Sequence, residues 1–496
     1  MALADYYYRS SVAASQALSG YDQSAIENRI ANTSVGIGFT SETARSFEGQ
    51  AAIDMLVRLF ARLYPRLAIW SAGGTPIGAE LAGLATLINP GIELTDGAAD
   101  IGVWIGPRPR RNATLMIYAG SSGWRALVGC ARAYGVGTSR IPFGGGAAAC
   151  LAAANVFRMA FLSSAVDTLD VSASLATADS PRPADVPMEL GSSAVLVGAG
   201  AIGQAVLWAI ARSPLQGSIW VVDHEEIDLG NLQRYVLTDR SHVGQAKASR
   251  GVDALANSQV QGEPYRGTWE SFVDQHGSSW HRVVVALDSA QGRRNVQASL
   301  PQWIGNGWTQ PGDLGVSFHA FGRGACLSCL YLSSEETDSE DVIVARALGV
   351  EDQLMQVRTL LYHDAGIPDE LLSLVSERLH VDENDAHRFQ GTRLRDFYQE
   401  GICGGALVPI GQAGTTRTAV HVPLAHQSAL AGVLLGAGLA SHAVHPVATR
   451  TRSLQLDVMR PLPPRLRFRT LRADPTNRCI CRDRDYLHRY RDKFPQ

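Results

Sequence analysis

The sequence has no strong charge imbalance and no long apolar run. Its 44 Lys and Arg residues nearly balance 47 Asp and Glu residues, and the net charge is −3. A general nucleic-acid-binding protein needs a basic surface, so we expect no nucleic-acid partner. The N-terminus, MALADYYYRSSVAA, lacks a basic segment followed by an apolar core, which predicts no signal peptide. The most apolar stretch, 429–440, is short and rich in Gly and Ala, which favours a buried helix and predicts no membrane partner.

Cysteine is also scarce, with seven residues in 496. Four of them form two close pairs, Cys326 with Cys329 and Cys479 with Cys481. This usage fits a reducing compartment and metal binding better than a disulfide scaffold, and we therefore expect a cytoplasmic protein. Cys130 and Cys150 lie in apolar surroundings and are expected to be core thiols.

The most informative stretch runs from Ser192 to Lys247. It begins with a short apolar run, Ala194–Val197, which predicts a buried parallel strand. Three glycines follow in G-x-G-x-x-G spacing: Gly198, Gly200 and Gly203. A second apolar run ends in Asp223, 20 residues after the last glycine, where a carboxylate meets a ribose hydroxyl. The pattern predicts a nucleotide-binding turn at a helix N-terminus, and a tight turn of purely structural role is the alternative.

The residues after Asp223, DHEEIDLGNLQRYVLTDRSHVGQAKA, distinguish this turn from that of an ordinary dehydrogenase. They resemble the signature of the ThiF/MoeB and ubiquitin-activating enzyme superfamily, with an N-L-Q-R followed by G-x-x-K-A. The resemblance implies that the glycine turn binds ATP and that Asp223 contacts its ribose. It also implies that Asn231, Arg234 and Lys247 contact the polyphosphate. Gln233 is then a supporting residue.

The chemistry of these residue types agrees with that resemblance. A triphosphate requires a forked guanidinium for paired oxygen contacts and a mobile ammonium as a point charge. Arg234 and Lys247 offer one of each. The alternative is that both are solvated side chains on a loop and a helix.

A further apolar run, VVVAL at 283–287, predicts a strand that ends at Asp288 in the sequence DSAQGRRN. The family pattern here is D-N-x-x-x-R, so Asp288 and Arg293 match while Ser289 replaces the asparagine. The resemblance implies that Asp288 holds Mg²⁺, a cation that prefers carboxylate and phosphate oxygens. The alternative is an acid that caps the next helix.

The two cysteine pairs also resemble the family, in which a C-x-x-C and a second pair after R-x-D-P bind zinc. Four thiolates from Cys326, Cys329, Cys479 and Cys481 would make a closed tetrahedral site. The second pair is C-x-C where the family has C-x-x-C, and we expect this spacing to strain its half of the site. Unliganded thiols are the alternative.

The first 165 residues are predicted to form a degenerate, inactive adenylation-like domain. A strand at 34–39, a helical pattern and a strand at 68–70 repeat the order of the later half, but the turn GIGFTSET lacks the third glycine. Ubiquitin-activating enzymes pair an inactive adenylation domain with an active one, and an unrelated α/β domain is the alternative. Arg9, in a segment resembling the family's R-Y-x-R-Q opening, is a weak candidate for a contact to the ATP of the paired domain. The alternative is an exposed arginine on a first helix.

The other domain boundaries follow from composition. A linker rich in Pro, Ser and Asp spans 166–190, the active adenylation domain spans 191–332, a helical insert of the catalytic-cysteine type spans 333–402, and the remainder of the adenylation domain spans 403–496. The insert ends at Gly-Ile-Cys-Gly-Gly, before an apolar helix from His426. The family carries its nucleophilic cysteine at a similar place, so Cys403 is the candidate nucleophile. A buried, inert Cys403 is the alternative.

Together these features predict an α/β protein with two Rossmann-like, doubly wound domains, one degenerate and one active, and a helical insert. The resemblance implies ATP-dependent adenylation of a ubiquitin-like protein with Mg²⁺ and Zn²⁺ as metals, then a thioester on Cys403 for a ubiquitin-conjugating-like enzyme. Bacterial modules of this family often sit in antiviral defence operons. The rival hypotheses are a sulfur-carrier adenylyltransferase of the thiamin or molybdopterin type, a non-catalytic nucleotide-binding scaffold and a dehydrogenase.

Overall fold

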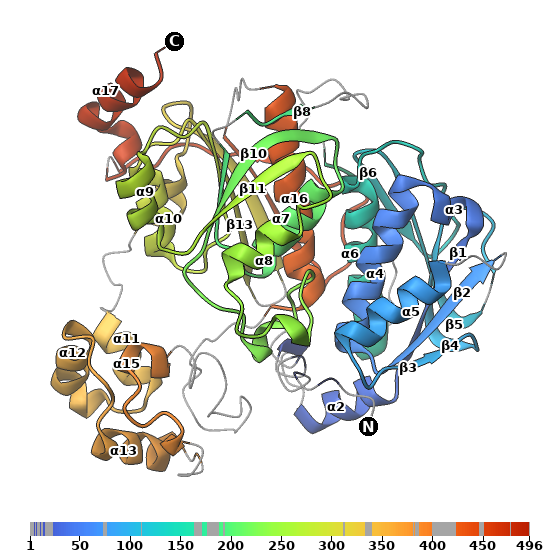
Figure 1. Ribbon diagram of the computed structural model, residues 1–496, viewed down its shortest axis with the longest axis horizontal. Helices are drawn as coiled ribbons and strands as arrows, with labels where there is room; N and C mark the ends of the chain where they lie inside the picture. The colour runs from blue at the N-terminus through green and yellow to red at the C-terminus, as the bar shows by residue number, and fades with distance from the viewer. Residues whose placement is uncertain are drawn as a thin grey trace. The chain divides into compact units, whose positions relative to one another are not determined.

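A computed structural model gives the arrangement of the chain (Figure 1). Two compact units are present, one formed by residues 1–10, 24–332 and 423–496 and the other by 11–23 and 333–422. The structure describes residues 4, 6, 10, 13–14, 23–72, 77–110, 112–162, 171–175, 188–191, 194–310, 313–332, 340–379, 381, 386–398, 423–445, 451–476 and 478–495.

The first unit contains two β-sheets. Among the described residues, the first sheet has the strand order β3-β2-β1-β4-β5-β6-β7. Its neighbours are parallel from β3 to β5, while β6 and β7 are antiparallel. The strands are β1 (Ser34–Thr40), β2 (Arg66–Ala72), β3 (Glu93–Thr95), β4 (Ala99–Ile105), β5 (Ala113–Ser122), β6 (Arg125–Gly129) and β7 (Val171–Ser174).

The second sheet repeats this topology. Its order in the described part of the chain is β11-β10-β9-β12-β13-β14-β15-β16, parallel from β11 to β13 and antiparallel beyond. A two-residue strand, β8 (Met188–Glu189), pairs with β10. The strands are β9 (Ala194–Val197), β10 (Leu215–Val222), β11 (Val260–Tyr265), β12 (Arg282–Val285), β13 (Trp303–Gln310), β14 (Asp313–Ala320), β15 (Arg452–Asp457) and β16 (Arg469–Thr470).

The helices of the two halves also occupy corresponding places in the order of elements. In each half one helix comes after the central strand, and a long helix lies in the chain between two antiparallel strands, which are β6 and β7 in the first half and β14 and β15 in the second. These helices are α4 (Phe47–Leu63) and α6 (Phe143–Phe161) in the first half, and α7 (Ala201–Ala211) and α16 (Ala425–Val444) in the second. The repeat confirms the predicted fold class of two doubly wound α/β halves.

These four helices form a layer between the two sheets (Figure 1). Small residues allow their backbones to approach closely. A Cβ atom on Gly432 of α16 would lie 2.4 Å from the Ile202 carbonyl oxygen of α7, and one on Gly145 of α6 would lie 2.5 Å from the Glu48 carbonyl oxygen of α4. The glycine- and alanine-rich composition of α6 and α16 therefore reflects helix packing.

The elements predicted from apolar runs are present with small shifts in their boundaries. The strand predicted at 194–197 has the predicted bounds. The strand predicted at 283–287 ends two residues earlier, at Val285. The long helical pattern after β1 is divided into α3 (Ser41–Arg45) and α4 because Ser46 accepts a hydrogen bond from the Gly49 amide and caps a new helix.

The remaining described helices of the first unit flank its second sheet or lie at its periphery. The helix α5 follows β2, and α17 ends the described chain. Their bounds are α2 (Gln23–Ala31), α5 (Ile77–Ile88), α8 (Lys247–Asp253), α9 (Trp269–His276), α10 (Ala290–Ala298) and α17 (Arg484–Lys493).

The second unit is helical in its described residues. Its helices enclose a separate apolar core that includes Leu348, Val357, Leu372 and Phe397, each 2% exposed or less. The helices are α11 (Glu340–Ala347), α12 (Leu354–Tyr362), α13 (Asp369–Leu379) and α15 (Leu394–Asp396). A helical segment was predicted here from the periodicity of the sequence.

One helix in the described part of the chain, α16, has the length and apolar composition that could cross a membrane. In the structure, 89% of its most apolar window is buried inside the protein. It packs against α6, α7 and the second sheet, in agreement with the prediction of a buried helix.

Two glycine substitutions test the helix layer. Gly432→Ala should lower the stability by about 1–3 kcal/mol, because the new methyl group overlaps backbone atoms of α7. Gly83→Ala is the matched control, since Gly83 lies in α5 with no atom within 4 Å of a new Cβ. The control should gain about 0.5–1 kcal/mol from better helix propensity. Equal melting temperatures for the two variants would contradict close packing of α7 on α16.

Candidate nucleotide and metal sites

The glycine turn between β9 and α7 is the centre of the candidate site. Gly198 has a φ of +95°, and a Cβ there would lie 2.6 Å from the Ala286 carbonyl oxygen at the end of β12. A Cβ on Gly203 would lie 2.0 Å from the Gly198 carbonyl oxygen. Both positions therefore require glycine. The N-cap of α7 is Gly200 and provides no side-chain hydrogen bond, so the first amides of this helix are available to an anion.

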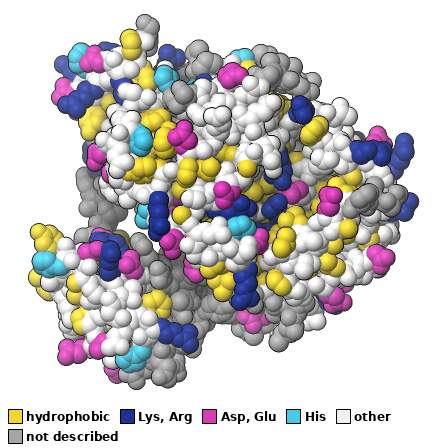
Figure 2. Space-filling view, viewed as in Figure 1, with side chains coloured by type: hydrophobic (Ala, Val, Ile, Leu, Met, Phe, Trp, Pro, Cys, Tyr) yellow, Lys and Arg dark blue, Asp and Glu magenta, His cyan; other side chains and the backbone are white. Residues whose placement is uncertain are grey.

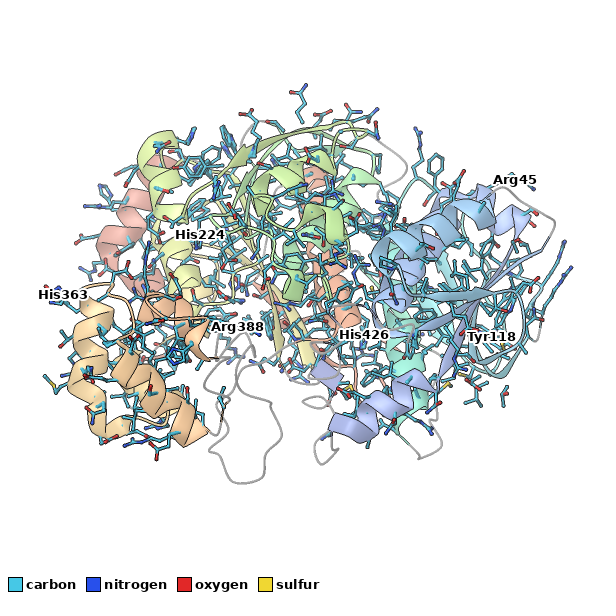
Figure 3. All side chains as sticks on the ribbon, turned by 60° about the horizontal axis from the view of Figure 1, so that its bottom comes forward. Arg45, Tyr118, His224, His363, Arg388 and His426 are labelled. Atoms are coloured by element: carbon cyan, nitrogen blue, oxygen red, sulfur yellow. The ribbon has the colours of Figure 1, made fainter. Side chains whose placement is uncertain are left out.

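Asp223 directly follows β10 and stabilises the glycine turn. Its carboxylate accepts hydrogen bonds from the Ala199 amide at 2.7 Å and from the Glu225 amide at 2.9 Å. Burial raises the pKa of Asp223, and the nearby charge of Lys247 opposes that shift. The adjacent His224 is exposed and marks this edge of the second half in Figure 3. Asp223 thus has a structural role in the turn, and its contact to ribose stays a prediction.

The predicted phosphate-binding residues Asn231, Gln233 and Arg234 lie on one segment of turns after β10. The Asn231 side chain accepts a hydrogen bond from the Asp228 amide at 3.1 Å. Gln233 is buried and donates to the Pro423 carbonyl oxygen at 3.2 Å, just before α16. Arg234 differs from both, because its Nη1 atom is buried and has no hydrogen-bond partner. A buried guanidinium nitrogen without a partner among the described residues is what is expected of a ligand for a phosphate oxygen.

Lys247 lies at the start of α8 with 5% of its surface exposed. It forms an ion pair with Glu225, and its Nζ atom lies 5.5 Å from the centre of the Tyr235 ring. Burial lowers the pKa of Lys247, but the neighbouring Tyr235, Glu225 and Asp223 more than offset this effect and hold it above the usual range. Lys247 is therefore charged at neutral pH.

Tyr235 connects the parts of this cluster and was not predicted from the sequence. Its ring also lies 5.7 Å from the Arg234 guanidinium, and a Cβ on Gly200 would lie 3.3 Å from its hydroxyl. Cation–π contacts of this kind hold Arg234 and Lys247 near the glycine turn. The only sequence signal was its place directly after N-L-Q-R.

Asp288 follows β12 at the carboxyl edge of the sheet and is exposed. The alternative that it caps the next helix is wrong, because Ser289 is the N-cap of α10 and accepts the Gly292 amide at 3.0 Å. The replacement of the family's asparagine by Ser289 thus has a local structural reason. The Asp288 carboxylate remains available for a cation at this edge.

The family-matched Arg293 holds the end of β12 in place. It is buried, and its guanidinium donates to the Leu287 carbonyl oxygen, to Asn306 at 3.0 Å and to the Tyr331 hydroxyl. These contacts fix the backbone directly before Asp288. Arg293 is therefore a supporting residue of the site, with few donors left for a ligand.

Two predicted residues lie outside the described part of the chain: Arg9 and Cys403. The neighbours of Arg9 are informative. Tyr6 packs against Ile227 and Leu232 of the second half, and the Ser10 hydroxyl lies 3.5 Å from the Arg62 carbonyl oxygen. The N-terminal segment thus reaches the border of the nucleotide site, and the role of Arg9 stays a prediction.

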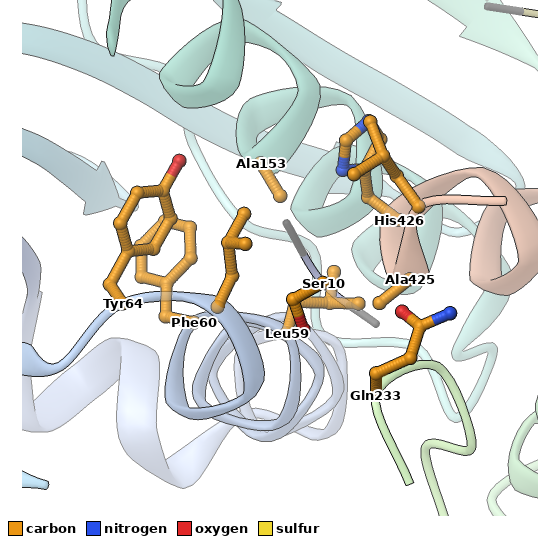
Figure 4. Close-up of a pocket in the computed structure, with 10 residues that line it drawn as sticks. Ser10, Leu59, Phe60, Tyr64, Ala153, Gln233, Ala425 and His426 are labelled. Carbon is orange, nitrogen blue, oxygen red and sulfur yellow. The ribbon is translucent and has the colours of Figure 1, made fainter. Parts of the chain in front are cut away.

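A small pocket lies beside the same segment, at the junction of the two halves (Figure 4). Gln233 and His426 line it from the second half, and Leu59, Phe60 and Tyr64 line it from α4. The pKa of His426 is lowered by burial to about 3, so its ring is neutral. The pocket is mostly apolar and contains none of the predicted phosphate-binding residues except the supporting Gln233.

The four predicted metal-binding cysteines come together in the second half. Cys326 is the N-cap of one 3-10 turn (Leu327–Leu330), and Cys329 lies within that turn. Cys479 is the N-cap of another (Ile480–Arg482), and Cys481 lies within it. All four sulfur atoms lie within 4.8 Å of one another, and four of the pairs are 3.3–3.9 Å apart.

This geometry fits a metal ion. Tetrahedral zinc with bonds of about 2.3 Å places its sulfur ligands about 3.8 Å apart. The 3-10 turn brings Cys479 and Cys481 close enough together, so the C-x-C spacing does not prevent a four-sulfur cluster. The Asp474 amide lies 3.5 Å from the Cys329 sulfur, a contact that stabilises a thiolate.

Comparisons with known proteins identify the family of the chain. Residues 189–480, more than half of the chain, match the ThiF family. The chain belongs to the ThiF family. Residues 38–162, within the first half, match Prokaryotic E2 family C.

Two relatives match different shares of this ThiF-family chain. It is 39% identical over 510 residues to the uncharacterized protein y4jF of Sinorhizobium fredii, covering the whole chain and 98% of that protein. It is 30% identical over 109 residues to the NEDD8-activating enzyme E1 catalytic subunit of Dictyostelium discoideum, covering 21% of the chain and 24% of that protein. A crystal structure of E. coli MccB with MccA-N7isoASN aligns at 13% identity, with a TM-score of 0.36 and coverage of 58% and 67%.

Family membership supports an adenylyltransferase that uses ATP. On the face of the molecule shown in Figure 2, basic and acidic side chains are interspersed over the described residues.

Metal analysis tests the cysteine cluster. We expect one zinc ion per chain, and Cys326→Ser should lower both the zinc content and the melting temperature because the ion ties the C-terminal segment to the second half. Cys150→Ser is the control, since Cys150 is a buried thiol of α6 outside the cluster, and it should keep the zinc. Purified protein without bound metal would refute the site.

Proposed function

We propose that this chain activates the C-terminal glycine of a ubiquitin-like protein by ATP-dependent adenylation. The observation that carries the proposal is the Arg234 guanidinium, whose buried Nη1 atom has no partner among the described residues. Arg234 lies against the Tyr235 ring, and the Tyr235 hydroxyl lies 3.3 Å from a Cβ built on Gly200, the N-cap of α7. A buried unpaired cationic donor costs stability, and a phosphate oxygen would satisfy it. Membership of the ThiF family makes ATP the ligand of choice.

Several of the predicted residues would then surround the nucleotide. The amides at the start of α7 and the Arg234 guanidinium would bind phosphate oxygens. Lys247 would exchange its half-exposed partner Glu225 for phosphate. Asp288 would hold Mg²⁺, which neutralises phosphate charge when it is bound.

The reaction begins when a carboxylate oxygen of the substrate attacks the α-phosphorus of ATP. The bond between that phosphorus and the bridging oxygen breaks, so that pyrophosphate leaves and an acyl-adenylate remains. Negative charge that develops on the phosphate oxygens is stabilised by Arg234 and Lys247, which are held by Tyr235 before the reaction. The site thus contributes positioning and electrostatic stabilisation.

In the second step we propose that the Cys403 thiolate attacks the acyl carbon and displaces AMP, giving a thioester for a ubiquitin-conjugating-like enzyme. The similarity to an E1 catalytic subunit supports this step, and so does the first-half match to a family named for prokaryotic E2 proteins. Cytoplasmic location and a place in a bacterial antiviral defence operon remain predictions that accompany this function.

The alternative function is sulfur-carrier adenylation, which needs the first step without the thioester. The helical unit and the first half favour the two-step reaction, because a simple sulfur-carrier enzyme needs neither. A non-catalytic scaffold is disfavoured by the unpaired Arg234 nitrogen beside the charged Lys247.

Pyrophosphate exchange tests the first step. Asp288→Ala should reduce ATP–pyrophosphate exchange by about a hundredfold or more, because the metal loses its protein ligand beside the phosphates. Asp274→Ala is the control, since Asp274 is an exposed acid on α9, and its exchange should equal that of the wild type. The assay uses candidate ubiquitin-like proteins as the carboxylate substrate. A folded Asp288→Ala enzyme with normal exchange would remove Asp288 from the mechanism.

A second assay separates the two chemical steps. Cys403→Ala should keep pyrophosphate exchange, which uses only the carboxylate, ATP and Mg²⁺, but should lose the thiol-sensitive adduct with the ubiquitin-like protein. The half-exposed Cys130 provides the control, because Cys130→Ala should keep both activities. Non-reducing gels with and without added thiol give the readout. An adduct that survives in Cys403→Ala would place the nucleophile elsewhere, and adenylation without any wild-type adduct would favour the sulfur-carrier alternative.

A further inference from the structure

Helix α4 of the first half presents a charged stripe to the nucleotide-binding half. Asp54, Arg58 and Arg62 follow at intervals of four residues and therefore share one face of the helix. Asp54 accepts hydrogen bonds from the Trp208 indole at 2.7 Å and lies 3.0 Å from an Arg212 nitrogen, both on α7. The stripe thus crosses the border between the two halves.

The two arginines of this stripe reach the segment that carries Gln233 and Arg234. Arg62 is 2% exposed and donates to the carbonyl oxygens of Leu232 at 3.0 Å, Tyr235 at 2.6 Å and Thr238 at 2.6 Å. Arg58 donates to the Val236 carbonyl oxygen at 2.8 Å. Four carbonyl groups within seven residues are therefore bound by two side chains of the other half.

The segment 232–238 depends on such contacts because it forms turns rather than a helix or a strand. Buried carbonyl groups without a partner are costly, and no sheet supplies partners here. The planar guanidinium of Arg62 spreads five N–H donors over three nitrogens, whereas an ammonium group has three donors on one nitrogen and covers a smaller area. On its other side the segment is held by the Leu237 amide, which donates to Gln204 of α7 at 3.0 Å.

We propose that Arg62, assisted by Arg58, is a positioning residue for ATP binding: the first half sets the shape of the segment that presents Gln233, Arg234 and Tyr235 to the nucleotide. Neither arginine belongs to the set of ligands expected from sequence motifs. The inference rests on the proposed function, because it assumes that ATP binds at this segment. It assigns the first half a direct part in building the nucleotide site.

A purely structural role for Arg62 predicts a different result from a positioning role. Arg212 supplies the matched control, because it is an arginine at the same border between the halves that contacts Asp54 and the Trp208 ring. It has no contact with segment 232–238 among its described bonds. Arg212→Ala therefore weakens the border between the halves and leaves the carbonyl contacts of the segment in place.

Two measurements on the full chain decide between these roles. Titration with ATP and Mg²⁺ should show that Arg62→Ala weakens ATP binding by on the order of tenfold or more, because the segment loses the charged hydrogen bonds that fix its shape. Hydrogen–deuterium exchange should show faster exchange of amides in 232–238 in this variant without nucleotide. Arg212→Ala should lower the melting temperature but leave both quantities at wild-type values.

Two milder variants keep the test decisive if Arg62→Ala does not fold. Arg62→Lys keeps the charge but can bind fewer carbonyl oxygens, and Arg58→Ala removes one contact, so both should show smaller changes in the same direction. Wild-type ATP affinity and wild-type exchange in Arg62→Lys and Arg58→Ala would overturn the proposal. Failure of the wild-type chain to bind ATP would instead contradict the proposed function, and hydrogen exchange would still decide whether Arg62 holds the segment.

Discussion

The rest of the structure depends on the close contact of four helices between two sheets. Helices α7 and α16 approach until a Cβ on Gly432 has no room, and α6 meets α4 in the same way at Gly145. Because both sheets place their central helices in this layer, each half covers an apolar face of the other. The layer also brings α4 to the segment 232–238, where ATP is expected to bind. The geometry of the site therefore depends on the packing of the core. A larger side chain at position 432 would overlap α7. A helix shift that relieved this overlap would also move the first turn of α7, where phosphate is expected.

The parts predictable from sequence were those that depend on neighbours along the chain. The glycine turn, the acid after β10 and the strand before Asp288 each combine an apolar run with a few residues of special backbone or charge, and the structure has all three. The split between α3 and α4 was missed, because one Ser cap outweighs a continuous helical pattern. Long-range contacts left no such local signal. Nothing in the spacing of Arg58 and Arg62 indicated that their partners lie about 170 residues away as backbone carbonyl groups.

The two halves share a topology but differ at the turn after the central strand. In the second half, the turn after β9 packs its own backbone on the end of β12. In the first half, α3 begins directly after β1, its N-cap Thr40 accepts the Thr43 amide, and Thr43 lies against Gly106 at the end of β4. Side chains of the protein thus take the place and the hydrogen bonds that a phosphate would need. We infer that this half no longer binds a nucleotide and acts through α4 instead. Its match to Prokaryotic E2 family C concerns 38–162, a region whose strand order is the same as that of the ThiF-family half.

In the second half, helix α10 contacts both the backbone before Asp288 and the turn that carries the first cysteine pair. Its Arg293 fixes the Leu287 carbonyl group before Asp288, while its Gln297 accepts the Leu327 amide between the cysteines of the first pair. The C-terminal segment approaches the same helix end, because Lys493 donates to the Ser299 carbonyl oxygen. A metal ion in the cysteine cluster would therefore stiffen the loop that holds α10, and through α10 the backbone beside Asp288. A bound ion would thereby restrict the motion of the strand end beside which the phosphates of ATP are expected to lie.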